Sequence, residues 1–133
     1  MSDLVNLEEA YATAKKHAGA PHHMGPMDSC SGHAKITGPC GDTMEFWILV
    51  EEDKIRKVTF VTDGCDPSKA CGSMTTCMAE GITIAQAKKI SQQDVLNALD
   101  GLPEDHAHCA LLATNTLKAA CEDYILKEKS KGG

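Results

Sequence analysis

Three features are missing from this sequence: a long apolar run, a surplus of positive charge, and a basic and then apolar N-terminus. No stretch approaches the roughly 18 apolar residues of a membrane-spanning helix, and the pattern of a signal peptide is absent. We therefore expect a cytoplasmic protein. A net charge of -6 and a pI near 5.4 argue against nucleic acid and membranes as partners, because both bind basic faces.

Two motifs are also absent, and aromatic residues are scarce at 4%. The chain has no Cys-x-x-Cys pair, which argues against thioredoxin-like exchange, zinc ribbons and permanent clusters of the ferredoxin type. It also has no glycine-rich loop of either common phosphate-binding type. We therefore expect that the chain does not itself use ATP or a dinucleotide.

The chain is rich in cysteine for its size. Its 133 residues, with 42% hydrophobic and 24% charged side chains, predict one folded domain over 1–133, with a core at about 20–126. The number of cysteines is odd and no export signal is present, so reduced thiols are expected rather than a disulfide framework. The seven cysteines are Cys30, Cys40, Cys65, Cys71, Cys77, Cys109 and Cys121.

Hydrophobic periodicity and helix-capping residues predict an α+β fold in which an antiparallel meander precedes several helices. The expected strands are 33–37, 43–50 and 55–62, with a hairpin turn at 51–54. The expected helices are 4–18, 67–80, a short one capped by Thr83 and Gln86, 91–101, and a last one after 103–105 that frays into a basic tail at 127–133.

Three cysteines occupy positions that suit metal binding. Cys40 lies in a glycine-rich turn between two strands, Cys65 lies between a strand and a helix, and Cys109 follows His108 in the first turn of the last helix. Helix N-termini stabilise anions, so we expect the last two placements to lower the thiol pKa and favour the metal-binding thiolate. Spacing alone leaves two interpretations, which are one site assembled by folding or three unrelated thiols.

The other cysteines fit a metal centre less well. At about 1.5 Å of rise per helical residue, Cys77 is too far from Cys65, and Cys121 too far from Cys109, to share one ion. Cys121 also falls beside an apolar stripe, so we expect a small core residue. Cys71 is ambiguous, with an auxiliary thiol as one interpretation, and Cys30 is either a mobile surface thiol or part of a lid over the site.

Three motifs together resemble the U-type iron-sulfur cluster assembly scaffolds, which are the IscU family and the N-terminal domain of NifU. The resemblance covers residues from about 20 to 126, and the three motifs stand in the order found in the family. They are Gly38-Pro39-Cys40-Gly41-Asp42, Asp63-Gly64-Cys65, and Leu102-Pro103 with His108-Cys109-Ala110-Leu111-Leu112-Ala113.

The resemblance implies a non-enzymatic scaffold that accepts sulfur from a cysteine desulfurase, assembles a labile 2Fe-2S or 4Fe-4S cluster and transfers it to apoproteins. It implies that the ligands are Cys40, Cys65 and Cys109, with Asp42 and His108 as candidates for the fourth position. A carboxylate or imidazole is a less well matched ligand than a thiolate and can leave, which allows release. Both a monomer and a homodimer are compatible with this role.

The chain departs from the family pattern at two places. The family's Leu-Pro-Pro-Val-Lys motif, which a dedicated Hsp70-type chaperone binds, is replaced by Leu102-Pro103-Glu104-Asp105-His106. Two acids replace the basic residue, which argues against recognition by that chaperone. After Cys65 the chain reads Asp66-Pro67-Ser68-Lys69-Ala70-Cys71 instead of the usual small residues, and this adds a thiol near the site.

Two other functions are compatible with these residues. A zinc-bound sulfurtransferase of the related SufU type would use the same ligands, and either zinc or iron is compatible with these ligands in purified protein. That branch carries an insertion between the second and third cysteine motifs, which is not evident here. A copper carrier would use His22, His23, Met24, Met27, Cys30 and His33, although loop composition explains this run more simply.

Overall fold

The computed structural model describes residues 23–38, 41–64, 66–102 and 106–132. Within these residues, three antiparallel strands precede four helices, which confirms the predicted α+β class. The strands are β1 (Gly32–Thr37), β2 (Thr43–Glu51) and β3 (Lys54–Thr62), and the helices are α3 (Asp66–Ala79), α4 (Ile84–Ala87), α5 (Gln92–Ala98) and α6 (His108–Gly132). The helix predicted at 4–18 lies outside the described residues.

The sheet has β2 at its centre, and each strand begins and ends within one residue of its prediction. Alternation along β2 leaves Met44, Phe46 and Ile48 fully buried on one face. At the β2–β3 turn, Glu52 and Asp53 have φ of 53° and 65°. Two consecutive positive φ values suit a tight hairpin because they match the twist of the flanking strands.

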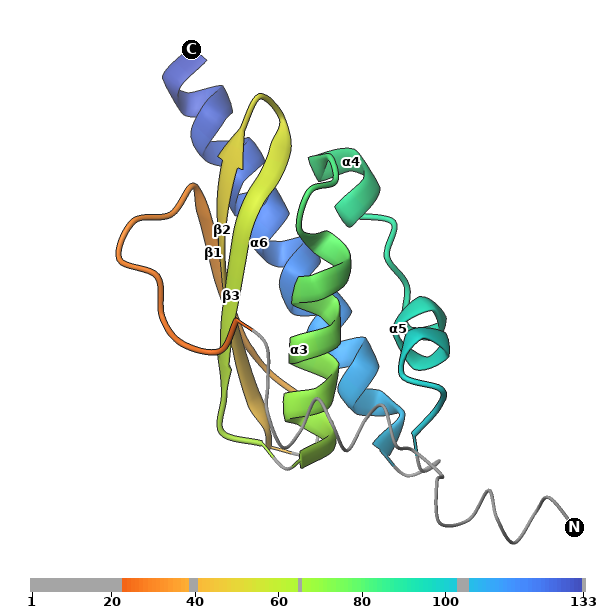
Figure 1. Ribbon diagram of the computed structural model, residues 1–133. Helices are drawn as coiled ribbons and strands as arrows, with labels where there is room; N and C mark the ends of the chain where they lie inside the picture. The colour runs from red at the N-terminus through yellow and green to blue at the C-terminus, as the bar shows by residue number, and fades with distance from the viewer. Residues whose placement is uncertain (1–22, 39–40, 65, 103–105, 133) are drawn as a thin grey trace, which may run out of the picture.

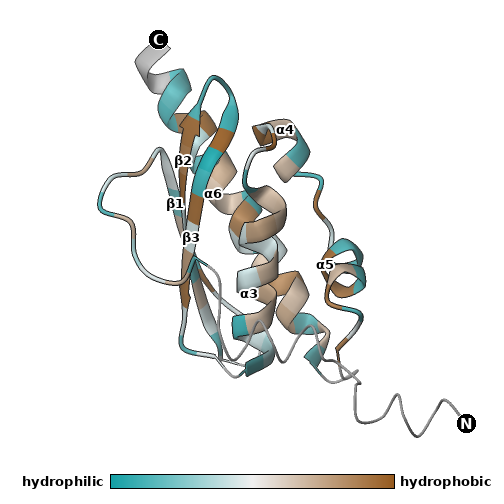
Figure 2. Cartoon of the chain, in the orientation of Figure 1, coloured by the Kyte–Doolittle hydropathy of each residue, from teal (hydrophilic) through white to brown (hydrophobic). Residues whose placement is uncertain are grey.

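The helices form two further layers on one side of the sheet (Figure 1). Helices α3 and α6 cover the sheet, while α4 and α5 lie farther out against them. In Figure 2, α6 is pale to brown where it crosses the sheet and turns teal toward its C-terminal end. The core therefore lies between β2, β3, α3 and α6.

Two glycines allow this helical layer to approach the sheet closely. A Cβ on Gly32 of β1 would overlap the carbonyl oxygen of Ala120 in α6. A Cβ on Gly72 of α3 would overlap the ring of Phe60 in β3. A side chain at either position would push a helix away from the sheet, and the apolar contacts between the layers would be lost.

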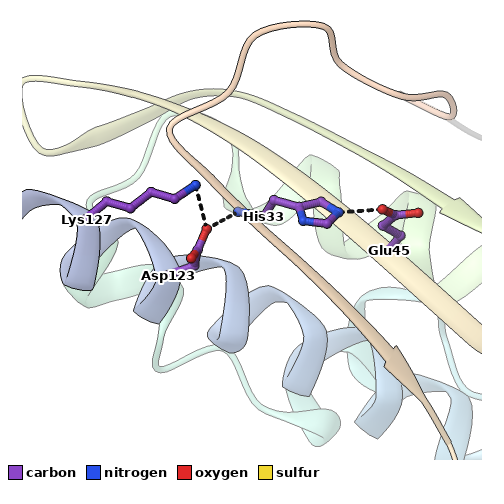
Figure 3. A network of polar contacts seen from close by, with 4 residues as sticks. All are labelled: His33, Glu45, Asp123 and Lys127. Carbon is purple, nitrogen blue, oxygen red and sulfur yellow. Dashed lines mark hydrogen bonds and ion pairs between the residues drawn. The ribbon is translucent and has the colours of Figure 1, made fainter.

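Strand β1 is joined to both β2 and α6 by a network of polar contacts (Figure 3). The His33 backbone N–H donates to Asp123 Oδ2 at 3.0 Å, and Lys127 Nζ lies 3.0 Å from the same oxygen. The His33 ring contacts the Glu45 carboxylate. Burial acts to raise the pKa of Asp123, but the hydrogen bonds from Lys127 and His33 outweigh it and hold that pKa below its usual value.

The predicted helix boundaries are confirmed where capping residues define them. Thr83 with Gln86, and Ser91 with Asp94, form reciprocal capping boxes at the starts of α4 and α5. Gly81, two residues after α3, has a φ of 89°, which a glycine adopts without strain.

The prediction that the last helix frays into a tail at 127–133 is wrong, because α6 remains helical to Gly132. Lysine and glutamate dominate this stretch and are good helix formers. The ion pair between Lys127 and Asp123 also joins successive turns. Within the part of the chain that the structure describes, no helix has the length and apolar character needed to cross a membrane.

Candidate functional site

The described parts of the three cysteine motifs meet at one end of the fold, at the bottom of Figure 1. A Cβ on Gly64, after β3, would lie 2.9 Å from Asp42 Oδ2 in the β1–β2 turn. A Cβ on Gly38, at the start of that turn, would lie 3.5 Å from the Leu112 side chain in the first turns of α6. The sheet and both covering helices therefore contribute to this end.

A buried serine connects two of the predicted site residues. Ser68, in the first turn of α3, has no exposed surface. Its hydroxyl is within donating distance of Asp42 Oδ2 at 3.0 Å and of Cys109 Sγ at 3.4 Å. The carboxylate and the thiol therefore converge on the same hydroxyl group, although they come from different elements.

Cys109 and His108 lie in the first turn of α6, as predicted. His108 Nε2 is 3.8 Å from Cys109 Sγ. Cys109 is buried, with 1% of its surface exposed. A metal ion or reagent therefore reaches this sulfur only when neighbouring atoms move.

Backbone hydrogen bonds hold the turn that carries Asp42. The Gly38 N–H donates to the Asp42 carbonyl at 2.8 Å, and Gly41 has a φ of 93°. Asp63, after β3, accepts from the Thr43 N–H at 2.8 Å through its carboxylate. These contacts fix the end of β3 against the start of β2, so the position of Asp42 follows from the pairing of the strands.

Two of the predicted ligands, Cys40 and Cys65, lie outside the described residues. Of the remaining predicted residues, the structure brings together Asp42, Cys109 and His108. No group of three or more His, Cys, Asp or Glu side chains suited to a metal ion occurs within 23–38, 41–64, 66–102 and 106–132. The described donors therefore amount to a partial set, a thiol with a carboxylate and an imidazole nearby.

The other cysteines differ in their surroundings. Cys121 is fully buried in the core, as predicted, and burial raises its pKa to about 11. Partial burial also raises the pKa of Cys77. Cys71 is fully buried on α3, so an auxiliary role would require it to act from inside the fold.

Cys30 lies before β1, at the end of that strand away from Asp42. Extended chain rises about 3.3 Å per residue, so the length of β1 separates Cys30 from the site. The interpretation of Cys30 as part of a lid is therefore wrong.

The histidines proposed for copper point to different neighbours. His23 Nδ1 is 3.1 Å from Thr76 Oγ1 in α3, whereas the His33 ring contacts Glu45 in β2. His22 lies outside the described residues. The structure therefore does not bring His23 and His33 together.

Sequence reasoning named Gly64 and Ser68 only as members of motif stretches, and gave neither residue a role in the site. Small residues recur at helical spacing along α3, and this pattern indicates a helix face in close contact with a neighbour. The residues on this face are Ser68, Cys71, Gly72 and Thr75, all of them buried. The pattern could have indicated that Ser68 is buried, but not that Asp42 lies opposite it.

Comparisons with known proteins identify the family of this chain. The family model described as the NifU-like N terminal domain matches residues 12–131. The chain is 38% identical to Iron-sulfur cluster assembly scaffold protein IscU 1 of Archaeoglobus fulgidus, over 84% of this chain and 73% of that protein. It is 34% identical to Iron-sulfur cluster assembly enzyme IscU of Drosophila melanogaster, over 87% of this chain and 78% of that protein.

A solved structure shares the fold. The N-terminal part of a nitrogen-fixing NifU-like protein from Brucella abortus superimposes with a TM-score of 0.70 over 91% of this chain and 98% of that one, at 15% identity. Because the family model spans nearly the whole chain, this protein belongs to the family of the NifU-like N-terminal domain.

Proposed function

We propose that this protein is a scaffold on which an iron-sulfur cluster is assembled and from which it is transferred to apoproteins. The cluster is cargo, and the protein acts as a holder rather than an enzyme. Relatives named as scaffold proteins for iron-sulfur cluster assembly support this role. The observation that supports the proposal is the convergence of Asp42 and Cys109 on Ser68, beside His108, where the described parts of the three cysteine motifs lie together.

The proposed ligands are Cys40, Cys65 and Cys109, with Asp42 or His108 in the fourth position. Thiolates bind iron firmly, whereas a carboxylate or an imidazole is a weaker partner for a cluster iron. Asp42 comes from a turn between strands and Cys109 from the start of a helix. One weaker ligand among three thiolates suits a cluster that must be released.

Sulfur would come from a cysteine desulfurase as a persulfide. Its outer sulfur is at the oxidation level of elemental sulfur, so an external electron donor must supply an electron pair for each sulfide formed. Iron also comes from outside the chain. The partners are thus the desulfurase, an electron donor and apo acceptor proteins, and we expect one cluster per one or two chains, working in the cytoplasm.

Anaerobic reconstitution tests this proposal. Wild-type protein is incubated with ferrous iron, a desulfurase, cysteine and a thiol reductant, and bound iron and sulfide are counted together with the absorption spectrum. We expect a cluster on the wild type and its loss in Cys40→Ala, Cys65→Ala and Cys109→Ala. Cys121→Ala is the matched control, since it removes a buried thiol from the same helix as Cys109 and should keep the cluster.

Two outcomes would contradict the scaffold proposal. The first is a wild-type protein that retains no cluster, or one that retains it unchanged in the three variants. The second is bound zinc without a cluster, together with stimulation of the desulfurase, which would instead indicate a sulfurtransferase of the SufU type.

The fourth ligand has its own test. If Asp42 is the ligand that leaves, Asp42→Ala should hold the cluster longer than wild type when an apo acceptor is added. Transfer from Asp42→Ala at the wild-type rate or faster would argue against Asp42 and favour His108.

A further inference from the structure

We infer that Ser68 is a positioning residue that promotes release of the cargo by binding the Asp42 carboxylate whenever that carboxylate leaves the metal. This inference rests on the proposed function and adds a residue that is not a ligand. Ser68 is fully buried, and its Oγ lies 3.0 Å from Asp42 Oδ2 and 3.4 Å from Cys109 Sγ.

The hydroxyl of Ser68 has a single proton to share between these two acceptors. The carboxylate is nearer and is the stronger acceptor, so the Ser68 hydroxyl donates its hydrogen bond to Asp42 in the metal-free protein. When Asp42 coordinates a metal, the hydroxyl can turn to the sulfur of Cys109, which is a weaker acceptor. Metal binding by Asp42 therefore exchanges a stronger hydrogen bond for a weaker one.

The exchange favours release. A carboxylate that leaves the metal in a partly buried site loses a ligand bond and gains little from water. Ser68 offers it a hydrogen bond in return, and this bond stabilises the state in which Asp42 is detached. Gly64 keeps room for the arrangement, because a Cβ there would lie 2.6 Å from Ser68 Oγ and 2.9 Å from Asp42 Oδ2.

The first test titrates the cargo-free protein with Co²⁺. Binding is measured by the absorption band of thiolate-to-metal charge transfer. Ser68→Ala removes the hydroxyl that competes for Asp42, so we expect Co²⁺ to bind about three- to tenfold more tightly, which is the net effect of one ordinary hydrogen bond, because wild type keeps the weaker bond to Cys109 when Asp42 binds the metal. Release of a reconstituted cluster to an apo acceptor should slow by a similar factor. Ser68→Thr keeps a hydroxyl and should behave as wild type.

Two controls make the result specific. Ser73→Ala removes another fully buried serine hydroxyl from α3, away from Asp42 and Cys109, and should leave Co²⁺ affinity unchanged. In an Asp42→Ala background, the further change Ser68→Ala should no longer tighten Co²⁺ binding, because the carboxylate for which the hydroxyl competes with the metal is gone. An equal effect of Ser68→Ala in both backgrounds would overturn the inference.

A measurement on the wild type needs no substitution. Carbon NMR signals of the Asp42 carboxylate and of Ser68 Cβ are followed while Zn²⁺ is added. We expect both signals to move together, since the hydroxyl changes partner as Asp42 binds. Movement of the Asp42 signal alone would contradict the exchange.

The outcomes separate this inference from the proposed function. A wild-type chain that binds neither Co²⁺ nor a cluster would refute both. A wild-type chain that binds both, with Ser68→Ala matching Ser73→Ala, would refute only the role of Ser68.

Discussion

The two halves of helix α6 contain buried thiols in different surroundings. At its start, Cys109 has the Ser68 hydroxyl at 3.4 Å and the His108 ring at 3.8 Å. Farther along, Cys121 is buried in the core, and this burial raises its pKa to about 11. Beyond Cys121, Asp123 accepts a hydrogen bond from the His33 N–H of β1 and pairs with Lys127 one turn along the helix.

This difference teaches that burial alone does not decide what a cysteine does. Both thiols are buried to a similar extent, at 1% and 0% exposed. Burial without polar partners keeps a thiol protonated and inert, whereas polar groups that converge on it can prepare it for a metal. We therefore propose metal chemistry for the first half of α6 and a stabilising role for the second.

The largest predicted effects come from replacing two glycines by alanine: Gly32, which faces the second half of α6, and Gly64, which faces Ser68 and Asp42 at the site. Gly32→Ala should lower the free energy of unfolding by about 3 kcal/mol, the upper end of the overpacking range, because the new Cβ meets the backbone oxygen of Ala120. Gly64→Ala should instead weaken Co²⁺ binding by about tenfold or more, since the new Cβ displaces the Asp42 carboxylate as a ligand, and this loss exceeds the gain from breaking its hydrogen bond to Ser68. Urea denaturation and Co²⁺ titration measure the two effects.

Each glycine variant serves as the control for the other. Gly32→Ala at a temperature where it remains folded should bind Co²⁺ as wild type does. A Gly64→Ala variant with wild-type metal affinity would contradict the division of the fold into a metal-binding region around Ser68 and a stabilising region around Gly32.

A smaller effect is expected from Cys121 at alkaline pH. Its folded pKa of about 11 exceeds the unfolded value of 9.0, so its contribution to stability is complete below pH 9 and is lost as the pH rises toward 11. That contribution is at most about 2–3 kcal/mol, at about 1.4 kcal/mol for each pKa unit. The stability difference between wild type and Cys121→Ala should therefore shrink over this range.

Denaturation curves at pH 8, 9, 10 and 11 measure the effect of Cys121. Cys77→Ala is the comparison variant. The pKa of Cys77 is also raised, but Cys77 is only partly buried, so the stability difference should change less with pH than it does for Cys121→Ala. A constant difference between wild type and Cys121→Ala across this range would mean that the thiol is not protected by the core.

The smallest effect is expected from Asp123, which is about one-third exposed. Hydrogen bonds hold its folded pKa below the unfolded value of 3.8, so its contribution is present above that value and is lost as the pH falls through the folded pKa. Asp123→Asn should reduce stability at pH 6 by less than about 1 kcal/mol, because solvent screens exposed pairs. At acidic pH the difference should disappear.

Thermal unfolding at pH 6 and at pH 2 to 3 measures the effect of Asp123. Glu122→Gln is the matched control, because Glu122 neighbours Asp123 on α6 and pairs with Lys88 instead of β1. If the thermal stability of both variants changes equally with pH, the hydrogen bond between Asp123 in α6 and His33 in β1 has no separate stabilising effect.

Local patterns were sufficient to predict most of the fold. The alternation along β2 and the capping residues Thr83 and Ser91 act between neighbours in the chain, and the elements begin and end close to their predicted bounds. The prediction failed at the end of α6, where composition suggested a tail but Lys127 bonds to Asp123 one turn earlier.

The site was predictable only in part, because its contacts join distant segments. Cys109, His108 and Asp42 were found from motifs, and the structure places them near one another. Ser68 was not recognised as a contact of both Asp42 and Cys109, since these residues are separated from it by long stretches of chain. The role of Gly64 likewise depends on atoms that no local pattern reveals.

By itself, the sequence determined the class of fold, the order of its elements and the residue types that make metal chemistry plausible, because periodicity, capping and motif spacing are local properties. Only the tertiary structure decided which polar side chains surround Cys109. That choice depends on the packing of α3 and α6 against the sheet, which leaves Cys121 in the core and brings Ser68 between Asp42 and Cys109.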